Sequence, residues 1–93
     1  MSLHIVSKSP FSSTALSDCL DAFAEGDALL LIEDGVYALS GRMSERPAVQ
    51  PVYCLAADAA ARGLQIPDSV TAVDDAGWVA LCAEHNPVVS WFK

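Results

Sequence analysis

The amino-acid sequence predicts an α/β fold, in which a five-stranded sheet carries helices on both of its faces. Short apolar segments of the kind that form strands alternate along the chain with segments whose apolar residues recur every three or four positions. Turn-forming glycine, proline and serine residues separate the two kinds of segment. This alternation is typical of a sheet packed between helices. We expect one domain, residues 1–93, because a chain of this length builds one small core.

The chain is expected to begin with a strand and a helix. Residues 3–6 are the first strand, and a serine-rich turn follows it. Ser12 or Ser13 can cap a helix that runs to about Ala24, because a serine oxygen accepts the free N–H groups of a first helical turn. The apolar residues of this helix have the i, i+3, i+4, i+7 spacing of a buried stripe: Leu16, Cys19, Leu20 and Phe23.

A buried strand and a polar connection are expected next. Gly26 ends the helix, and the continuous apolar run 28–32 is the pattern of a strand buried on both faces. Residues 33–35 are expected to form a turn, and the type of the short element at 36–39 stays open. Residues 41–50 are the most polar and least patterned segment, so we expect a surface connection there.

The rest of the chain continues the alternation of strands and helices. Gly63 ends a short helix, Asp74 caps a longer one, and Asn86-Pro87 terminates that longer helix. The expected elements are strands at 51–55, 70–73 and 88–92, and helices at 56–62 and from 74 to about 85.

The chain is acidic, with 12 Asp and Glu residues against 5 Lys and Arg residues and a formal net charge of −7. Nucleic-acid binding needs clustered basic residues, so direct binding is excluded. No apolar run approaches the length of about 20 residues that spans a bilayer. Three widely spaced cysteines without a Cys-x-x-Cys pair indicate neither a disulfide framework nor a zinc site. We expect a cytoplasmic protein with reduced thiols, no bound metal and no cofactor.

Several polar and aromatic residues have a structural explanation beside a functional one. The hydroxyl-rich segment 7–14 precedes a helix N-terminus and could bind phosphate, but it lacks glycines, and capping and turn formation explain its serines. His4 is interpreted as a hydrogen-bonded structural side chain, the alternative being a ligand. Glu33-Asp34 could be general acids or bases, although turn formation suffices. Trp91-Phe92 is expected to pack within the subunit or against a partner.

Cys19 is the candidate functional residue. Cys54 and Cys82 fall among apolar residues and are expected in the core. Cys19 is more ambiguous, because on a helical wheel it lies near the edge of the buried stripe. Asp18 and Asp21 flank it, and nearby carboxylates disfavour a thiolate, which predicts a weak nucleophile. The residues alone leave open whether Cys19 is a reactive thiol or a core residue.

An ordered set of short segments resembles the DsrH/TusB family of sulfur-relay subunits. The set covers essentially the whole chain, and its order and spacing are more specific than any one segment. The segments are Leu3-His4, Ser9-Pro10, Cys19-Leu20, Glu25-Gly26-Asp27, Leu30-Leu31, Glu33-Asp34-Gly35-Val36-Tyr37-Ala38, Val52-Tyr53 to Leu55, Ala61-Arg62-Gly63, Val73-Asp74 and Val89-Ser90-Trp91.

The resemblance implies a three-layer α/β/α fold of the DsrE/F/H type with a mostly parallel five-stranded sheet. It implies a heterohexamer in which this chain meets TusC/DsrF-like and TusD/DsrE-like subunits, with upstream and downstream sulfur-carrier proteins as further partners. The implied function is transfer of persulfide sulfur between proteins, for 2-thiolation of the wobble uridine of tRNA or for dissimilatory sulfur oxidation. Cys19 matches a cysteine of DsrH-type members and becomes the candidate persulfide-carrying thiol. No independent catalytic activity is expected.

Two rival hypotheses remain beside sulfur transfer through Cys19. In the first, the chain is a structural subunit that stabilises the hexamer and carries no sulfur. In the second, it is an isolated ligand-binding domain that uses the serine-rich segment 7–14. An apolar content of 53%, high for so small a domain, favours a subunit that buries surface against other chains.

Overall fold

The computed structural model describes residues 1–40 and 51–91. Within them, five strands form one sheet, in the spatial order β4-β3-β2-β1-β5. The strands are β1 (Leu3–Val6), β2 (Ala28–Leu31), β3 (Val52–Leu55), β4 (Val70–Val73) and β5 (Val88–Trp91). Each strand is four residues long, and its last residue is the predicted last residue or the one before it.

All neighbouring strands of the sheet run parallel. The chain starts at β1 and builds outward through β2 and β3 to β4, and β5 then lies on the opposite side of β1. Parallel neighbours need crossover connections, which the helices supply. The helices are α1 (Ala15–Ala22), the 3₁₀ helix η1 (Glu33–Leu39), α2 (Ala56–Ala61) and α3 (Asp75–Glu84).

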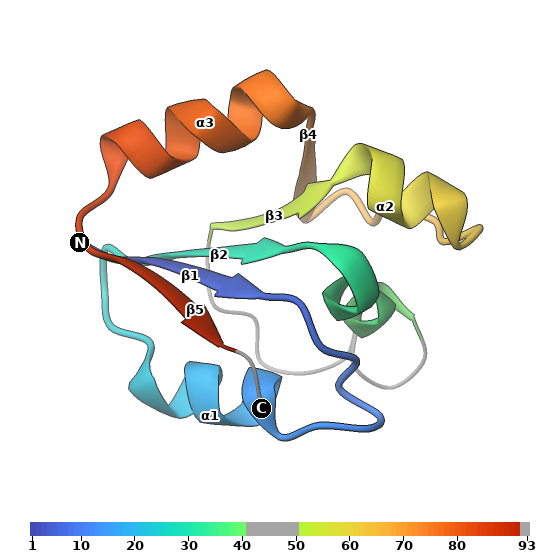
Figure 1. Ribbon diagram of the computed structural model, residues 1–93, viewed down its shortest axis with the longest axis horizontal. Helices are drawn as coiled ribbons and strands as arrows, with labels where there is room; N and C mark the ends of the chain where they lie inside the picture. Colours follow the sequence, from blue (N-terminus) through green and yellow to red (C-terminus); the bar gives the residue numbers. More distant parts are fainter. Residues whose placement is uncertain (41–50, 92–93) are drawn as a thin grey trace.

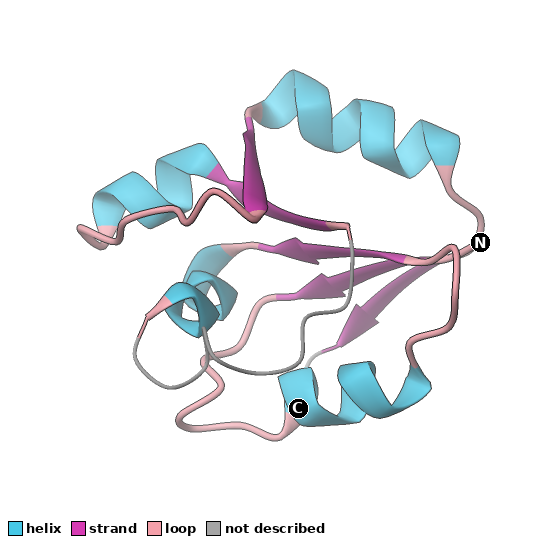
Figure 2. Ribbon diagram, turned by 180° about the vertical axis from the view of Figure 1, so that it is seen from behind, coloured by secondary structure: helices cyan, strands magenta, loops and turns pink. Residues whose placement is uncertain are grey.

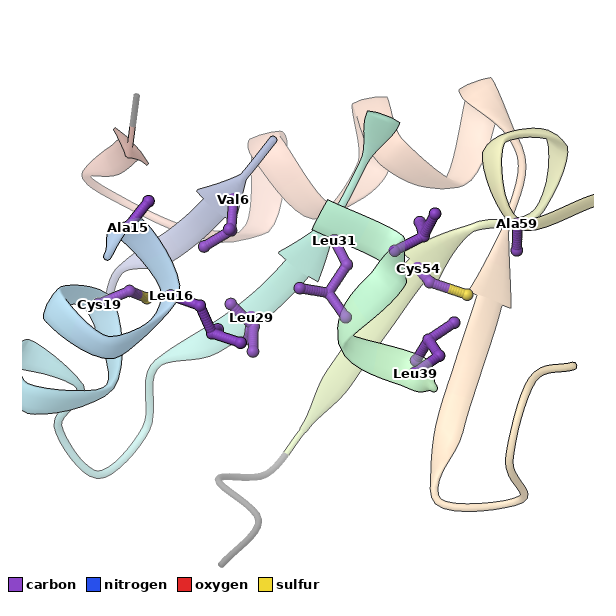
Figure 3. Close-up of a cluster of buried hydrophobic side chains, with 10 residues drawn as sticks. Val6, Ala15, Leu16, Cys19, Leu29, Leu31, Leu39, Cys54 and Ala59 are labelled. Atoms are coloured by element: carbon purple, nitrogen blue, oxygen red, sulfur yellow. The ribbon is translucent and has the colours of Figure 1, made fainter. Parts of the chain in front are cut away.

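Helices cover both faces of the sheet, so the fold has three layers (Figures 1 and 2). On one face, α1, η1 and α2 enclose a first core with alternate strand residues: Val6, Ala15, Leu16, Cys19, Leu29, Leu31, Val36, Leu39, Cys54 and Ala59 (Figure 3). On the other face, α3 encloses a smaller second core: Leu3, Ile5, Ala28, Leu30, Ile32, Leu55 and Leu81. The predicted α/β class and five-stranded parallel sheet are confirmed.

The first helix differs from the prediction at both ends. It begins at Ala15 after Thr14, whose hydroxyl donates to the Asp18 carboxylate at 3.1 Å instead of capping the helix. The Ser13 hydroxyl accepts the Ala15 N–H at 3.1 Å. Ser13 thus supports the first turn from the position before the N-cap residue Thr14, and not as the N-cap itself. The helix ends at Ala22, two residues before the predicted end.

Residues 33–39 form one 3₁₀ helix, where the sequence predicted a turn and an element of open type. Gly35 explains how this helix packs so closely. A Cβ at this position would overlap the carbonyl oxygen of Val6, so only glycine lets η1 lie against the end of β1. Further along, Asp74 caps α3 as predicted and accepts the Gly77 N–H at 2.8 Å. The predictions for residues 41–50 and for Phe92 lie outside the described residues.

Candidate functional site

Cys19 lies inside the first core, on the face of α1 that packs against the sheet (Figure 3). Its exposed fraction is 0%, so its side chain is fully covered. The helical wheel places Cys19 off the centre of the stripe, but β5 packs beside β1 and extends the covered surface beyond that stripe. The thiol therefore has no path to another protein in this conformation.

Burial also makes Cys19 a poor nucleophile. Desolvation raises the pKa of the Cys19 thiol from its ordinary value of 9.0 to about 12, and the nearby Asp27 carboxylate adds to the rise. The sequence predicted the direction of this shift but attributed it to Asp18 and Asp21. A neutral thiol neither attacks a persulfide nor binds a metal ion, since the thiolate is the reactive form.

A hydrogen-bonded chain of three side chains, two of them buried, lies near Cys19. The Trp91 indole N–H donates to Nδ1 of His4 at 3.1 Å, and Nε2 of His4 lies 2.8 Å from Oδ2 of Asp27. His4 and Asp27 are 4% and 6% exposed. Because the indole N–H can only donate, Nδ1 must accept, which leaves the ring proton on Nε2 to donate to Asp27. This confirms the interpretation of His4 as a hydrogen-bonded structural side chain.

Asp27 joins three separate parts of the chain. Besides His4, its carboxylate accepts the N–H of Ser2 at 2.8 Å and the N–H of Ala24 at 3.0 Å. These hydrogen bonds lower the pKa of Asp27 from 3.8 to about 2, and the hydrogen bond from His4 has the largest effect. The group stays ionised at neutral pH and fixes the turn after α1, the start of β1 and, through His4, the end of β5.

The His4 ring is also held by aromatic neighbours. The centroid of the Phe23 ring lies 5.3 Å from that of His4, and the Trp91 ring stacks on it at 6.1 Å. Trp91 therefore packs within the subunit, one of the two expected arrangements. The role of Asp27 was not predicted; its place directly before a strand buried on both faces is the signal that could have indicated it.

A second polar cluster lies beyond the end of β2 and joins η1 to α2. Arg62 donates to Asp34 at 2.9 and 3.1 Å and lies over the Tyr37 ring. The Asp58 carboxylate accepts the Glu33 N–H at 2.7 Å, which holds Glu33 at the unusual φ of 48°. The Asp34 carboxylate is occupied by Arg62, and Glu33 takes part through its backbone N–H, so both residues have the structural role in the turn that was weighed for them.

The serine-rich segment 7–14 is organised by its own hydrogen bonds. The Ser9 hydroxyl accepts the Phe11 N–H at 3.2 Å, and the Ser9 carbonyl accepts the Ser12 N–H. In the two described stretches, no group of three His, Cys, Asp or Glu side chains is placed to hold a metal ion. No helix found in residues 1–40 or 51–91 is both long and apolar enough to cross a membrane.

Comparisons with known proteins give a family and a fold. A family model described as "DsrH like protein" matches residues 8–88. Proteins named "Protein TusB" from Pectobacterium parmentieri and from Escherichia coli O139:H28 are each 37% identical over 95 residues, which covers 96% of this chain and 99% of theirs. Among solved structures, the ychN protein from E. coli superposes with a TM-score of 0.75 and 19% identity, over 98% of this chain and 99% of that one. At that identity the last likeness concerns the fold alone.

Proposed function

The chain belongs to the DsrH-like protein family, and from this premise we propose that it is a subunit of a cytoplasmic complex that passes persulfide sulfur between proteins. The sulfur is used for 2-thiolation of the wobble uridine of tRNA. The observation that carries the proposal is the near full-length similarity, at 37% identity, to relatives named TusB. Partner subunits of the TusC/DsrF and TusD/DsrE types complete the complex.

Sulfur moves along such a relay by thiol exchange. An acceptor thiolate attacks the outer sulfur of a donor persulfide, the new S–S bond forms as the old one breaks, and the donor leaves as a thiolate. No electrons are gained or lost overall. The acceptor must be ionised and exposed, and the buried Cys19 thiol with its pKa of about 12 is neither in the isolated chain.

Of the two roles open to this subunit, we therefore favour the structural one. The chain shapes the complex and its docking surfaces, while a thiol on another subunit accepts the sulfur. The carrier role of Cys19 requires that assembly move α1 away from the sheet and bring positive charge to the thiol. The sulfur-oxidation alternative uses the same exchange chemistry, and the TusB names of the relatives favour tRNA thiolation.

The proposed function is tested by deleting the gene and measuring 2-thiouridine in cellular tRNA by mass spectrometry. We expect the modified nucleoside to be lost and to return when the chain is supplied again. An unchanged 2-thiouridine level would contradict the tRNA role and favour sulfur oxidation.

The role of Cys19 is tested in the purified complex. After loading with cysteine desulfurase, cysteine and an upstream carrier, the intact mass of each subunit shows which of them gains sulfur. The structural role predicts that this chain stays unloaded, and that Cys19→Ser and the matched buried variant Cys54→Ser both support tRNA thiolation. A gain of one sulfur atom that only Cys19→Ser abolishes would establish Cys19 as a carrier.

A further inference from the structure

The outward side of helix α3 is apolar. Its four exposed residues at i, i+3, i+4 and i+7 are Ala76, Val79, Ala80 and Ala83, which we call the outer face of α3. The opposite side packs on the sheet through Trp78, Leu81 and Cys82. A helix at a protein surface normally turns charged or polar residues to water, and one that is apolar all round is normally covered on both sides.

Helix α1 shows what a solvent-facing helix of this chain looks like. It packs on the opposite face of the sheet and places Asp18 and Asp21 away from its buried stripe. Val79 of α3, in contrast, is 69% exposed. The two helices lie on opposite sides of the sheet in Figure 1, and the apolar outward side is that of α3.

The apolar surface on the α3 side extends to the edge of the sheet. Val88 of β5 is aligned with Leu3 of β1, so it points to the same side of the sheet as the second core. It is 42% exposed, because α3 does not cover β5 fully. The outer face of α3 and Val88 thus belong to the same side of the molecule.

Apart from the N-terminal ammonium of Met1, which donates to the Asn86 carbonyl at 3.3 Å, the charges around this surface are negative. Between Gly63 and Trp91 the sequence has no Lys or Arg, and its four acidic residues are Asp68, Asp74, Asp75 and Glu84. All four are exposed. Asp74 and Asp75 lie at the start of α3 and Glu84 at its end, so the outer face is apolar along its length and acidic at both ends.

We propose that the outer face of α3 docks a different protein chain, whose contact surface is apolar in the centre and carries Lys or Arg at its rim. A second copy does not fit, because pairing α3 with itself in either direction brings acidic ends against acidic ends, and like charges disfavour such a contact. The proposal rests on the proposed function and gives the chemistry of the surface by which a neighbouring subunit of the relay complex recognises this chain.

The test is co-expression of the tagged chain with the TusC/DsrF-like and TusD/DsrE-like subunits of the same genome, followed by purification and titration of the isolated subunits. Val79→Glu places a charge in the centre of the surface without touching the core. We expect affinity to fall by at least about tenfold, since a buried unpaired charge costs more than the 1.4 kcal/mol of one decade. Ala22→Glu, an exposed helical position on the opposite side of the sheet, is the matched control and should bind like the wild type.

Charge complementarity is tested separately with Glu84→Lys. A cation at the end of a helix interacts favourably with the helix dipole, so weaker binding by this variant cannot be attributed to a less stable α3. Wild-type binding should also weaken as salt is raised, because exposed charge pairs are screened. Circular dichroism and thermal unfolding confirm that each variant is folded.

Each outcome has one meaning. Loss of binding in Val79→Glu and Glu84→Lys, with binding kept in Ala22→Glu, supports the proposal. Wild-type assembly that Val79→Glu leaves unchanged overturns the proposal and leaves the proposed function standing. A wild-type chain that binds neither subunit overturns both. A wild-type homodimer that Val79→Glu dissociates shows that a second copy occupies the surface, and this also overturns the proposal.

Discussion

Alkylation of the native chain with iodoacetamide at about pH 8 tests how completely the fold hides the Cys19 thiol. An ordinary thiol with a pKa of 9.0 is about one-tenth thiolate at this pH, whereas a thiol with a pKa of about 12 is about 10⁻⁴ thiolate. Ionisation alone therefore slows the reaction about a thousandfold. The 0% exposure of the side chain adds a steric barrier, so modification must wait for the chain to open.

The population of the open state gives a second, independent value for the slowing of the alkylation of Cys19. If the chain alone is stable by about 5 kcal/mol, the open state has a population on the order of 10⁻⁴. Both estimates predict that Cys19 reacts at least about a thousandfold more slowly in the folded chain than in urea. Cys54 is the matched control because it is equally buried, and burial raises its pKa as well. Cys82 is half-buried and should react faster than either.

Peptide mapping follows each thiol separately. Trypsin places the three cysteines in different peptides, because it cleaves after Lys8, Arg42 and Arg62. Modification of Cys19 in the folded chain within about tenfold of its rate in urea, with Cys54 still protected, would contradict this prediction. That result would show that α1 opens on its own, and it would give the carrier role of Cys19 the access it needs.

Three further predictions concern stability. Above about pH 4, Asp27 stabilises the fold fully, because its pKa is about 2 in the folded chain against an ordinary 3.8; this contribution is lost as the pH falls toward 2. Urea unfolding measured across this pH range should show the free energy of unfolding falling, and the fall should be smaller in Asp27→Asn. The same dependence on pH in both proteins would contradict the role of the carboxylate. Gly35→Ala should lower the free energy of unfolding by about 3 kcal/mol, because its Cβ overlaps the Val6 carbonyl oxygen, and an unchanged urea midpoint would show that η1 can shift freely. Asp74→Ala should cost about 1 kcal/mol through loss of the α3 cap, whereas Asp74→Ser should keep most of the stability; equal losses would argue against a capping role.

The central strands β1 and β2 could be predicted from the sequence because burial on both faces leaves a local pattern. Residues 28–31 are all apolar, and every one of them is buried in β2. The cap of α3 was equally local, since Asp74 and Gly77 are three positions apart. The resemblance to the DsrH/TusB family added the parallel arrangement of the strands, which spacing alone does not give.

What the sequence did not predict depends on contacts between distant residues. Trp91 and His4 are 87 positions apart, so nothing near either one indicates their hydrogen bond. The same holds for η1, whose position depends on the contact of Gly35 with Val6. The helical wheel placed Cys19 near the edge of the buried stripe but could not show that it is fully covered, because a wheel shows a helix by itself, without the sheet that covers it.

The pairing of β1 with β5 affects the order in which the chain can fold. β1 lies inside the sheet although it is made first, and one of its two partners is the strand made last. The Leu3 N–H donates to Pro87, and the Asn86 N–H donates to the carbonyl of Met1. During synthesis, β1 therefore keeps one unpaired edge beside the apolar Leu3 and Ile5 until the last strand emerges, and such an edge can pair with other chains. Contacts of this sequence separation also slow folding, which lengthens the time for which this edge of β1 stays unpaired.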